Sequence, residues 1–503
     1  MNNTIQNRWL LPATIVAVVL YAFYFYPYFV DDGYISLRYA QRLIHGHGLT
    51  WNDGEYVEGY SNLLWVLLTA ALGYIGFDLP ASARALGLAC TLLTPLALFY
   101  HARQARLPLM ALMAGLAIYV CTPAVAIWAM AGMETPLLML LLSWAIVLTC
   151  GLLTASDGRT SSVIGLLLGF ICLLRPEGPV YAIVTAAAFL LHADVPVPSR
   201  LRTIAHIAAV ASPFFLGQLA FRLYYYGEFV SNTVLVKVGV SETHLLQGVL
   251  YTANALLTLL PLILYGVINL YRSACRKERE FYERSGLFAA TIFFFLTVAV
   301  TISGGDIFPG LRAFAPLIPL LALIFMDSVT AGLRLTGLKT EACFLAALGL
   351  SYIWLQASVE INQRPKYSLW EMDAKAMGEA LKQRYAAGHP LIAVYTAGAI
   401  PFYSGLPAID VYGLNDRYLA ETRAANPYFD TGLIGHELFD AAYVESRKPD
   451  ILVFDVPGLM PLCSLKKYRE GCDELLAHYR RTMLNIPGHS VPIWLRKGSD
   501  KVK

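Results

Sequence analysis

The chain has 503 residues, of which 57% are hydrophobic and only 15% are charged. Ordinary soluble domains carry about 25% charged residues. Together with a mean hydropathy of +0.54, this composition excludes a typical soluble enzyme and indicates a polytopic membrane protein. The net charge of +3 is too small to indicate a nucleic-acid partner, so the distribution of the basic residues along the chain is more informative than their sum.

Long apolar segments follow one another through the first 360 residues. The first, LLPATIVAVVLYAFYFYPYFV (10–30), follows Arg8 and lacks an A-x-A cleavage pattern. It therefore predicts an uncleaved membrane helix and not a signal peptide. The later apolar segments are 86–100, 109–130, 137–153, 162–175, 178–192, 204–221, 248–271, 285–303, 314–332 and 342–358. The sequence thus predicts about eleven membrane helices.

Lys and Arg gather in alternate loops between these segments. The loops are HARQARLP, SDGRTS, VPSRLR, RSACRKEREFYER and GLRLTGLK. Basic loops are typical of the cytoplasmic side of a membrane, so these loops and the N-terminus are predicted to be cytoplasmic. This assignment requires SNLLWVLLTAALGYIGF (61–77) to be an amphiphilic helix at the outer membrane surface and not a spanning segment.

Five polar clusters fall on the predicted outer side. They are the loop with Asp31 and Asp32, GMETP (132–136), RPEG (175–178), YYYGEFVSNTVLVKVG (224–239) and GGDIFPGLR (304–312). A single charged residue there often only caps a helix or pairs with a neighbour, but charge near a lipid boundary is costly and marks a functional site by default. The charged residues of this side whose combination indicates a function are Arg38, Arg175, Arg222, Lys237, Arg312, Asp31, Asp32, Glu58, Glu134, Glu177 and Asp306.

After about residue 361 short apolar strands alternate with helical stretches. The expected strands are LIAVY (391–395), AIDVY (408–412), DILVF (450–454) and VPIWL (491–495), and EMDAKAMGEALKQRYA reads as a helix. This alternation predicts a small α/β domain. We therefore divide the chain into a transmembrane module, 1–360, with a first outer loop at 27–80, and an extracytoplasmic α/β domain, 361–503.

Two of the eight cysteines, Cys463 and Cys472, lie in a polar stretch of the C-terminal domain. They would be able to pair in an oxidising compartment, although two free thiols fit the sequence equally well.

Cations and carboxylates near a lipid boundary suit the transfer of a group from a lipid phosphate. Arginine presents a planar fork that matches phosphate oxygens, and a nearby carboxylate can accept the proton of an attacking hydroxyl. Tyr34, Trp51, Tyr60 and Trp65 are candidates either for stacking on sugar rings or for an aromatic belt at the membrane surface.

The segment DDGYISLRYAQRLIHGHGLTWNDGEYVEGYSNLLW (31–65) resembles the first extracytoplasmic loop of bacterial C-type (GT-C fold) glycosyltransferases, which take a sugar from a polyprenyl phosphate. GMETP, RPEG, YYYGEFVSNTVLVK and GGDIFPGLRAFAP are similar to the branch that contains mycobacterial terminal arabinofuranosyltransferases. AGAIPFYSGLPAIDVYGLND and GHE extend the resemblance into the C-terminal domain. It implies a multi-pass protein of the bacterial cytoplasmic membrane, with the active site and C-terminal domain on the outer side.

The resemblance also implies roles for single residues. Asp31 or Asp32 corresponds to the first-loop general base, Glu134 to the acid at the outer end of the third helix, and Arg175 to a basic residue near the donor phosphate. The candidate substrate-binding residues are Arg38, Glu58, Tyr60, Asn62, Glu134, Arg175, Glu177, Asn232, Lys237, Asp306 and Arg312.

We therefore expect an inverting glycosyltransferase. An acceptor hydroxyl, deprotonated by Asp31 or Asp32, would attack the anomeric carbon while polyprenyl phosphate leaves. The branch resemblance suggests arabinofuranose as the sugar, and the acceptor would be an envelope glycan, lipid or surface protein. No cofactor is required; an Asp pair is also a ligand set for a divalent cation, so metal dependence stays open.

Two other functions compete with this expectation. A transporter or flippase for a lipid-linked sugar would also need cations near lipid, but the sequence lacks two-half symmetry and paired interrupted helices. A nonenzymatic envelope scaffold would leave the charged residues at the membrane boundary without a purpose.

Overall fold

The computed structural model describes residues 9–237, 242–276, 278–425 and 438–502. The chain forms two compact units. We call them the helical unit, which comprises Met1–Tyr26, Arg84–Gln218 and Leu245–Pro365, and the α/β unit, which comprises Pro27–Ala83, Leu219–His244 and Lys366–Lys503. The first-loop segment thus packs with the C-terminal residues, whereas the sequence grouped it with the membrane helices.

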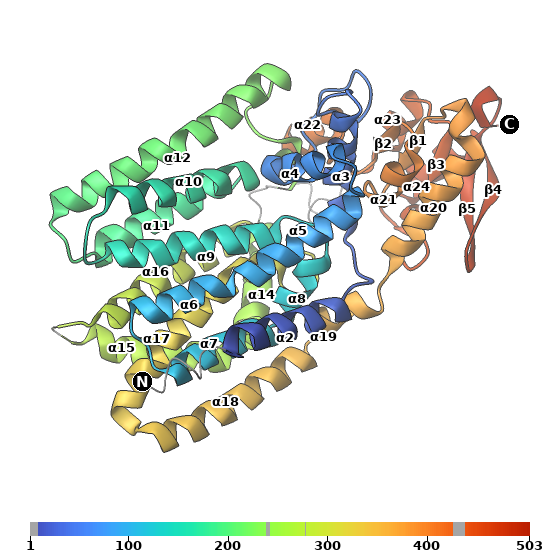
Figure 1. Ribbon diagram of the computed structural model, residues 1–503. Helices are drawn as coiled ribbons and strands as arrows, with labels where there is room; N and C mark the ends of the chain where they lie inside the picture. Colours follow the sequence, from blue (N-terminus) through green and yellow to red (C-terminus); the bar gives the residue numbers. More distant parts are fainter. Residues whose placement is uncertain (1–8, 238–241, 277, 426–437, 503) are drawn as a thin grey trace. The chain divides into compact units, whose positions relative to one another are not determined.

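The helical unit is built from apolar helices joined by short loops (Figure 1). Its helices are α2 (Leu10–Tyr24), α5 (Leu79–Leu93), α6 (Pro95–Gln104), α7 (Leu109–Cys121), α8 (Pro123–Met130), α9 (Thr135–Leu152), α10 (Gly158–Leu174), α11 (Gly178–His192), α12 (Val197–Tyr225), α14 (Glu242–Thr258), α15 (Leu260–Ala274), α16 (Phe281–Ile302), η2 (Arg312–Leu317), α17 (Ile318–Thr336), α18 (Leu338–Ser358), α19 (Glu360–Gln363) and η3 (Arg364–Lys366). The beginnings of α5 and α14, the end of α12 and the last residue of η3 belong to the α/β unit.

The helices confirm a multi-pass membrane protein, although fewer of them than expected have the length of a span. Among the described residues, six are long and apolar enough to cross a membrane, or up to eight if each of two bent pairs counts as one span. The expected number was about eleven. The difference is made up by three shorter apolar helices of 15 to 17 residues, α2, α10 and α11, which the apolar pattern alone does not distinguish from full spans.

Two expected spans are broken by proline. α7 and α8 meet at an angle of 53°, and α14 and α15 meet at 80°. Pro123 is the first residue of α8 and Pro261 the second residue of α15. Because proline lacks an N–H and fits the first turn of a helix but not its interior, a new helix starts at each position.

The segment expected to lie at the membrane surface contains α4 (Leu63–Tyr74), a helix of 12 residues. At 1.5 Å per residue it is about 18 Å long, well short of the roughly 30 Å hydrocarbon core. Like α2, α10 and α11, it is shorter than a full span, and its position at the outer membrane surface stays a prediction.

A polar group of three side chains is buried in the core of the helical unit. His101 on α6 lies 2.9 Å from the carboxylate of Asp327 on α17, and the hydroxyl of Ser285 on α16 donates to the other oxygen of that carboxylate at 3.0 Å. A buried carboxylate of this kind is retained only when hydrogen-bonded. The group therefore joins three helices.

The α/β unit confirms the small α/β domain. Its helices are α3 (Asp31–Ile44), α4, α13 (Asn232–Lys237), α20 (Trp370–Tyr385), η4 (Ala386–Gly388), α21 (Ala399–Ser404), α22 (Arg417–Ala425), α23 (Ala441–Ser446), η5 (Leu462–Ser464), α24 (Arg469–Leu476) and η6 (Asp500–Val502). Its strands are β1 (Ile392–Val394), β2 (Ala408–Asp410), β3 (Ile451–Val453), β4 (Tyr479–Ile486) and β5 (His489–Arg496).

The five strands form one mixed sheet in the order β2-β1-β3-β5-β4. β1 pairs in parallel with β2 and β3, and β5 pairs antiparallel with β3 and β4. All four expected strands and the helix α20 are present. β4 was missed because Arg480 and Arg481 interrupt its apolar pattern; both are exposed.

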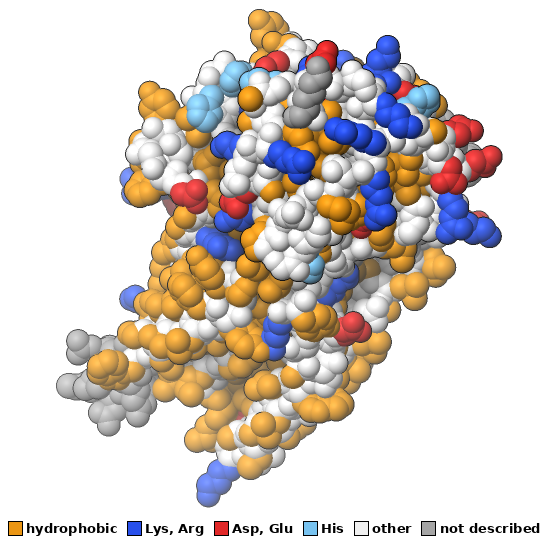
Figure 2. Space-filling model, turned by 90° about the vertical axis from the view of Figure 1, so that its right-hand side faces the viewer, with side chains coloured by type: hydrophobic (Ala, Val, Ile, Leu, Met, Phe, Trp, Pro, Cys, Tyr) orange, Lys and Arg blue, Asp and Glu red, His pale blue; other side chains and the backbone are white. Residues whose placement is uncertain are grey.

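The two units differ in their surfaces. Apolar side chains cover most of the visible surface of the helical unit, while Lys, Arg, Asp and Glu gather on that of the α/β unit (Figure 2). The apolar surface of the helical unit, with exposed residues such as Leu350, Trp354 and Ile183, is what lipid-facing helices require.

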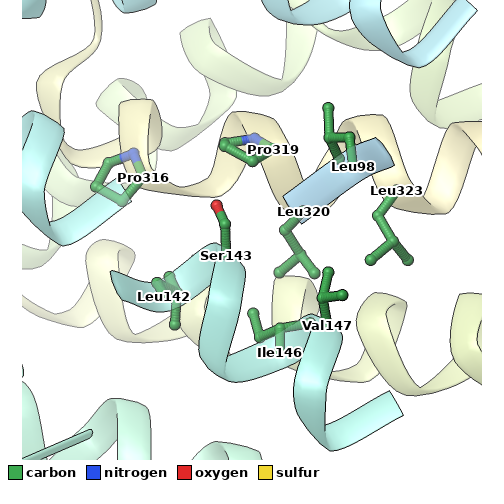
Figure 3. A pocket seen from close by; sticks show the side chains of 9 residues that line it. All are labelled: Leu98, Leu142, Ser143, Ile146, Val147, Pro316, Pro319, Leu320 and Leu323. Atoms are coloured by element: carbon green, nitrogen blue, oxygen red, sulfur yellow. The ribbon is translucent and has the colours of Figure 1, made fainter. Parts of the chain in front are cut away.

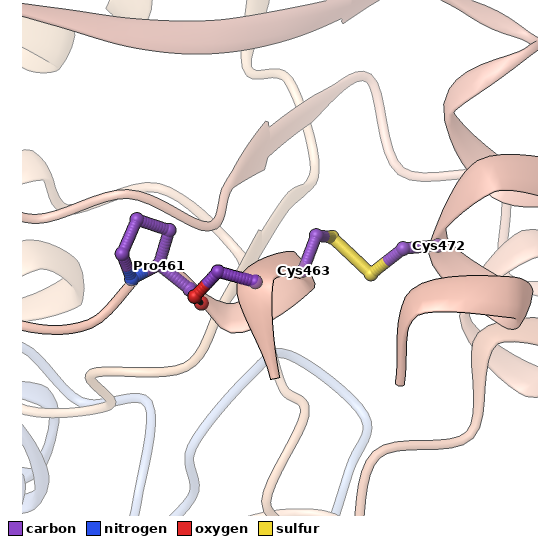
Figure 4. The surroundings of a disulfide bond; sticks show 4 residues. Pro461, Cys463 and Cys472 are labelled. Atoms are coloured by element: carbon purple, nitrogen blue, oxygen red, sulfur yellow. Dashed lines mark hydrogen bonds between the residues drawn. A yellow bond between two sulfur atoms is a disulfide. The ribbon is translucent and has the colours of Figure 1, made fainter. Parts of the chain in front are cut away.

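A disulfide joins Cys463 in η5 to Cys472 in α24 (Figure 4). The two cysteines are nine positions apart, with their Cα atoms 5.7 Å apart. Of the two alternatives left open by the sequence, the structure has the bridge.

We expect maleimide labelling of the unfolded protein to reveal two more thiols after reduction than before it. Cys463→Ser should abolish the increase attributed to the bridge and leave Cys472 labelled without reduction. Equal labelling of the wild-type protein before and after reduction would contradict the bridge.

Candidate active site

The two first-loop aspartates begin a helix of the α/β unit. α3 starts at Asp31, directly after the extended residue Val30, and both acids lie in its first turn. Negative charge is favourable there because the free N–H groups of the first turn carry partial positive charge. Asp31 and Asp32 thus lie on the same helical turn, and their side chains point in different directions.

Asp31 is buried and faces the loop between β1 and α21. Its two carboxylate oxygens accept hydrogen bonds from the backbone N–H groups of Gly398 at 2.8 Å and Ala399 at 2.7 Å. A Cβ atom at Gly398 would overlap the backbone of Asp31, so only glycine permits this approach. The sequence did not identify Gly398; the small residues of TAGAIP after a predicted strand were its only signal.

Burial raises the pKa of Asp31 from 3.8 to about 7. The N–H groups of Ala399 and Gly398 lower the pKa, whereas the negative charges of Asp32 and Asp410 raise it further. Burial outweighs the two hydrogen bonds because removing a carboxylate from water is more costly than they offset.

This raised pKa predicts a pH-dependent contribution to stability. Because folded Asp31 retains its proton up to about pH 7 and the unfolded side chain loses it near 3.8, its favourable contribution is present below pH 4 and is lost as the pH rises to 7. We expect the unfolding free energy of the wild-type protein to fall over this range relative to that of Asp31→Asn, measured by chemical denaturation in detergent. A difference that is constant with pH would contradict the raised pKa.

Asp32 has a different environment. Its carboxylate forms an ion pair with Lys237 of α13, with Oδ2 and Nζ 3.2 Å apart, and 21% of its side chain is exposed. Since Asp31 is only 6% exposed, Asp32 is the more accessible acid of the pair. The structure thus places Lys237, another candidate from the sequence, beside the aspartate pair.

Arg38 is buried in the α/β unit and makes its hydrogen bonds within the protein. It donates to the backbone carbonyls of Trp51, Pro401 and Leu406 and to the side chain of Asn52. Burial lowers its pKa to about 9. These contacts favour a structural role, in which Arg38 fastens α3 to the C-terminal part of the chain.

Four other candidates of this unit are also buried and engaged. Glu58 pairs with Arg222, and the Tyr60 hydroxyl lies 3.1 Å from that of Tyr226. Asn62 accepts a hydrogen bond from the Ser36 hydroxyl at 3.0 Å. Asn232 donates to the backbone carbonyls of Gly413, Leu414 and Asp416. These interactions tie the first loop and α13 into the unit.

The aromatic residues proposed to stack on sugars do not lie on the surface. Tyr34, Trp51, Tyr60 and Trp65 are all buried. They pack in the interior of the α/β unit, so neither a sugar platform nor a membrane belt is formed by their rings.

The candidates of the helical unit come together in one cluster. Arg175, which follows α10, donates from Nη1 to Glu134 at 2.6 Å and from Nε to Glu177 at 2.8 Å. Glu134 is fully buried, whereas Glu177 is partly exposed. Among the residues that the structure describes, none forms a hydrogen bond or ion pair with Nη2 of Arg175, and the Arg175 side chain is partly exposed.

Arg312 and Asp306 form a second ion pair in this cluster, and it is bidentate. Nε of Arg312 lies 2.5 Å and Nη2 3.2 Å from the two oxygens of Asp306. The guanidinium also lies 4.2 Å from the centre of the Phe308 ring and 5.6 Å from that of Trp128. Nη1 of Arg312 also lies 3.5 Å from Sδ of Met133, the neighbour of Glu134 in the chain, so the two groups of ion pairs lie close together. Trp128 was missed because it lies in an unbroken apolar run.

An apolar crevice lies among α6, α9 and the start of α17 (Figure 3). It is narrow, with room for about one water molecule. It is lined by Leu98, Leu142, Ser143, Ile146, Val147, Pro316, Pro319, Leu320 and Leu323. Pro316 belongs to η2, the element that begins at Arg312, so the crevice starts about one turn from the charged cluster.

No group of three metal-ligating side chains converges among the residues that the structure describes. The aspartate pair alone is an incomplete ligand set.

Comparison with known proteins gives the fold a context. A family described as "Domain of unknown function (DUF8728)" matches residues 360–493, and no curated protein sequence matches the chain. The structure of ArnT from Cupriavidus metallidurans bound to undecaprenyl phosphate is similar with a TM-score of 0.65 at 13% identity, over 98% of each chain. That of the archaeal oligosaccharyltransferase AglB from Archaeoglobus fulgidus, in complex with an inhibitory peptide and a dolichol-phosphate, is similar with a TM-score of 0.56 at 12% identity, over 99% of this chain and 77% of that chain.

The chain therefore has a GT-C-like fold over almost its whole length. Identities of 12% and 13% are evidence for the fold alone, since one fold hosts different chemistries and function has to be argued from the site.

Proposed function

We propose that this protein is an integral membrane glycosyltransferase that moves a sugar from a polyprenyl-phosphate donor to an envelope glycan, lipid or surface protein. The observation that carries the proposal is the accessible first-loop carboxylate Asp32, held by Lys237, on a fold similar to two proteins solved with lipid phosphates. The sequence motifs resemble those of arabinofuranosyltransferases, so arabinofuranose as the transferred sugar stays a prediction.

Binding of the donor is assigned to the helical unit. Arg175 and Arg312 supply guanidinium groups for the phosphate. Both arginines already have carboxylate partners, so a phosphate would compete with Glu177, the partly exposed partner, or bind through the Nη2 group of Arg175. Guanidinium groups held in this way stabilise the charge of the departing phosphate.

Activation of the acceptor is assigned to Asp32. A general base has to reach the hydroxyl that it deprotonates, and Asp32 is more exposed than Asp31. Asp31 instead positions the first turn of α3 through its bonds to Gly398 and Ala399. The acceptor oxygen then forms the new bond to the anomeric carbon while the bond to the phosphate oxygen breaks, which inverts the configuration. No cofactor enters this scheme.

The α/β unit is proposed to face the outside of the bacterial cytoplasmic membrane. Its disulfide supports this orientation because disulfides persist in oxidising compartments. The basic loops of the sequence support the same orientation.

The test is transfer from a synthetic polyprenyl-phosphate sugar by the purified protein in detergent. We expect polyprenyl phosphate to be released only in the presence of an acceptor, with inversion at the anomeric carbon seen by NMR. A flippase would move the intact donor across a vesicle membrane without cleaving it, and this result would replace the proposal.

A further inference from the structure

Two tyrosines of the α/β unit form an aromatic stack at the protein surface. Tyr418 on α22 and Tyr443 on α23 lie with ring centres 4.4 Å apart and planes 19° apart. Tyr418 is 50% exposed, so solvent reaches its side chain although Tyr443 covers one ring face. The stack holds the ring in place, and a rigid tyrosine binds a partner at a low cost in conformational entropy.

Charged side chains fix the inner ring of this stack. The Tyr443 hydroxyl donates to Oδ2 of Asp416 at 2.7 Å and accepts from Nη1 of Arg447 at 2.8 Å. Arg447 also donates from Nη2 to Oε1 of Glu55 at 2.5 Å. Glu55 and Arg447 are partly exposed, so a carboxylate and a guanidinium lie beside the rings.

A second exposed tyrosine and ion pair lie next to α22. Arg417, the neighbour of Tyr418 in the chain, donates to the backbone carbonyl of Tyr56 at 3.4 Å and pairs with Glu228 at 3.3 Å. The side chain of Tyr56 is 51% exposed. We call the set Glu55, Tyr56, Arg417, Tyr418, Tyr443 and Arg447 the Tyr418 surface.

We propose that the Tyr418 surface binds a saccharide, and that this saccharide belongs to the acceptor. The second part rests on the proposed transferase function. Sugar rings carry C–H groups with partial positive charge on their faces, which suit the negative face of an aromatic ring. Their hydroxyl groups both donate and accept hydrogen bonds, which suits neighbouring carboxylate and guanidinium groups.

The balance of charge favours a neutral saccharide over other partners. Each exposed arginine of the surface has a carboxylate partner, Glu55 for Arg447 and Glu228 for Arg417. Paired charges leave little net field to attract an anionic lipid or an acidic peptide. The exposed tyrosines stand among polar side chains, unlike the apolar patches that mark protein-binding sites.

The test uses saturation-transfer NMR on the full chain in detergent. The probes are the methyl glycosides of glucose, mannose, galactose and arabinofuranose. We expect saturation transfer to the ring C–H protons of at least one glycoside, and Tyr418→Ala should weaken its binding by more than about twofold and up to about 10-fold, since aromatic contacts contribute about 0.5–1.5 kcal/mol. Tyr418→Phe keeps the ring and should bind within about twofold of wild type.

Tyr367→Ala is the matched control, because Tyr367 is also an exposed tyrosine of the α/β unit and takes no part in the contacts described above. It should bind the glycoside as the wild type does. Absence of saturation transfer from all four probes, or equal weakening by Tyr367→Ala and Tyr418→Ala, would overturn the proposal. Binding of a protein or a lipid at this surface would give the first of these results.

The binding measurement does not depend on turnover, so the two proposals fail separately. If the protein transfers sugar, Tyr418→Ala should raise the KM for a glycan acceptor by more than about twofold and up to about 10-fold, with kcat and donor affinity unchanged. Transfer with an unchanged acceptor KM would remove the Tyr418 surface from the acceptor site. Glycoside binding without any sugar transfer would support saccharide binding at the Tyr418 surface and refute the proposed transferase activity.

Discussion

Asp32→Asn should lower the turnover number for sugar transfer about 100-fold or more, because a positioned general base contributes about 10²- to 10⁴-fold. An asparagine side chain has the shape of aspartate but cannot take a proton from the acceptor hydroxyl. The variant loses the charge that pairs with Lys237, and since both side chains are partly exposed this loss is mild for folding. Donor binding should therefore change little. Turnover is measured by transfer from a synthetic donor, and binding is measured separately.

Asp53→Asn is the matched control. Asp53 is another first-loop carboxylate, paired with Arg42, and its side chain is 79% exposed. Its replacement should leave turnover within about twofold of the wild-type value, as expected of an exposed pair. Asp31→Asn should act mainly on stability and its pH dependence. Full activity in the Asp31→Asn, Asp32→Asn double variant would refute the catalytic role of Asp32 and the positioning role of Asp31.

The fold was predictable where the signal is local. Apolar runs predicted a membrane protein, and the alternation after residue 361 predicted the α/β domain with four of its five strands. The number of helices long enough to span was overestimated because an apolar run does not reveal where a proline such as Pro123 starts a new helix.

The candidate site was predictable in its residue types but not in their partners. Charge near a lipid boundary identified Glu134, Arg175, Asp306 and Arg312, and the structure brings them into one cluster. The partner of Asp31 is 367 residues away in the chain. No spacing in a single sequence indicates a contact of that range, because it depends on how the sheet folds.

The same limit explains why several first-loop candidates have structural contacts. Arg38 was grouped with phosphate-binding cations because charge alone does not distinguish a ligand contact from a bond to a backbone carbonyl. The sequence likewise suggested that Trp51 stacks on a sugar ring. Its indole N–H instead donates to the backbone carbonyl of Ala408 at 3.1 Å in the interior of the protein. The residues of the Tyr418 surface come from separate segments of the chain and were not identified.

Arg175→Lys should weaken binding of a polyprenyl-phosphate donor by about 10-fold or more, since a hydrogen bond to a charged group contributes about 1.5–3 kcal/mol. Lysine keeps the positive charge near the buried Glu134, so the unit should fold, but it lacks the planar fork that contacts a carboxylate and a phosphate at the same time. Arg175→Ala should have a larger effect on both donor binding and folding, because it leaves Glu134 buried without this partner.

Arg284→Lys is the matched control in the helical unit, since Arg284 also forms an ion pair, with Asp194 at 2.8 Å, and takes no part in the cluster. Donor affinity is measured by displacement of a fluorescent polyprenyl phosphate, and the thermal midpoint of each variant reports its folding. Glu177→Gln removes the partly exposed carboxylate that would compete with the phosphate for Arg175, so it should strengthen donor binding or leave it unchanged. Weaker donor binding by Glu177→Gln, together with unchanged donor binding by Arg175→Lys, would show that the donor phosphate does not bind at Arg175. The cluster would then have a structural role.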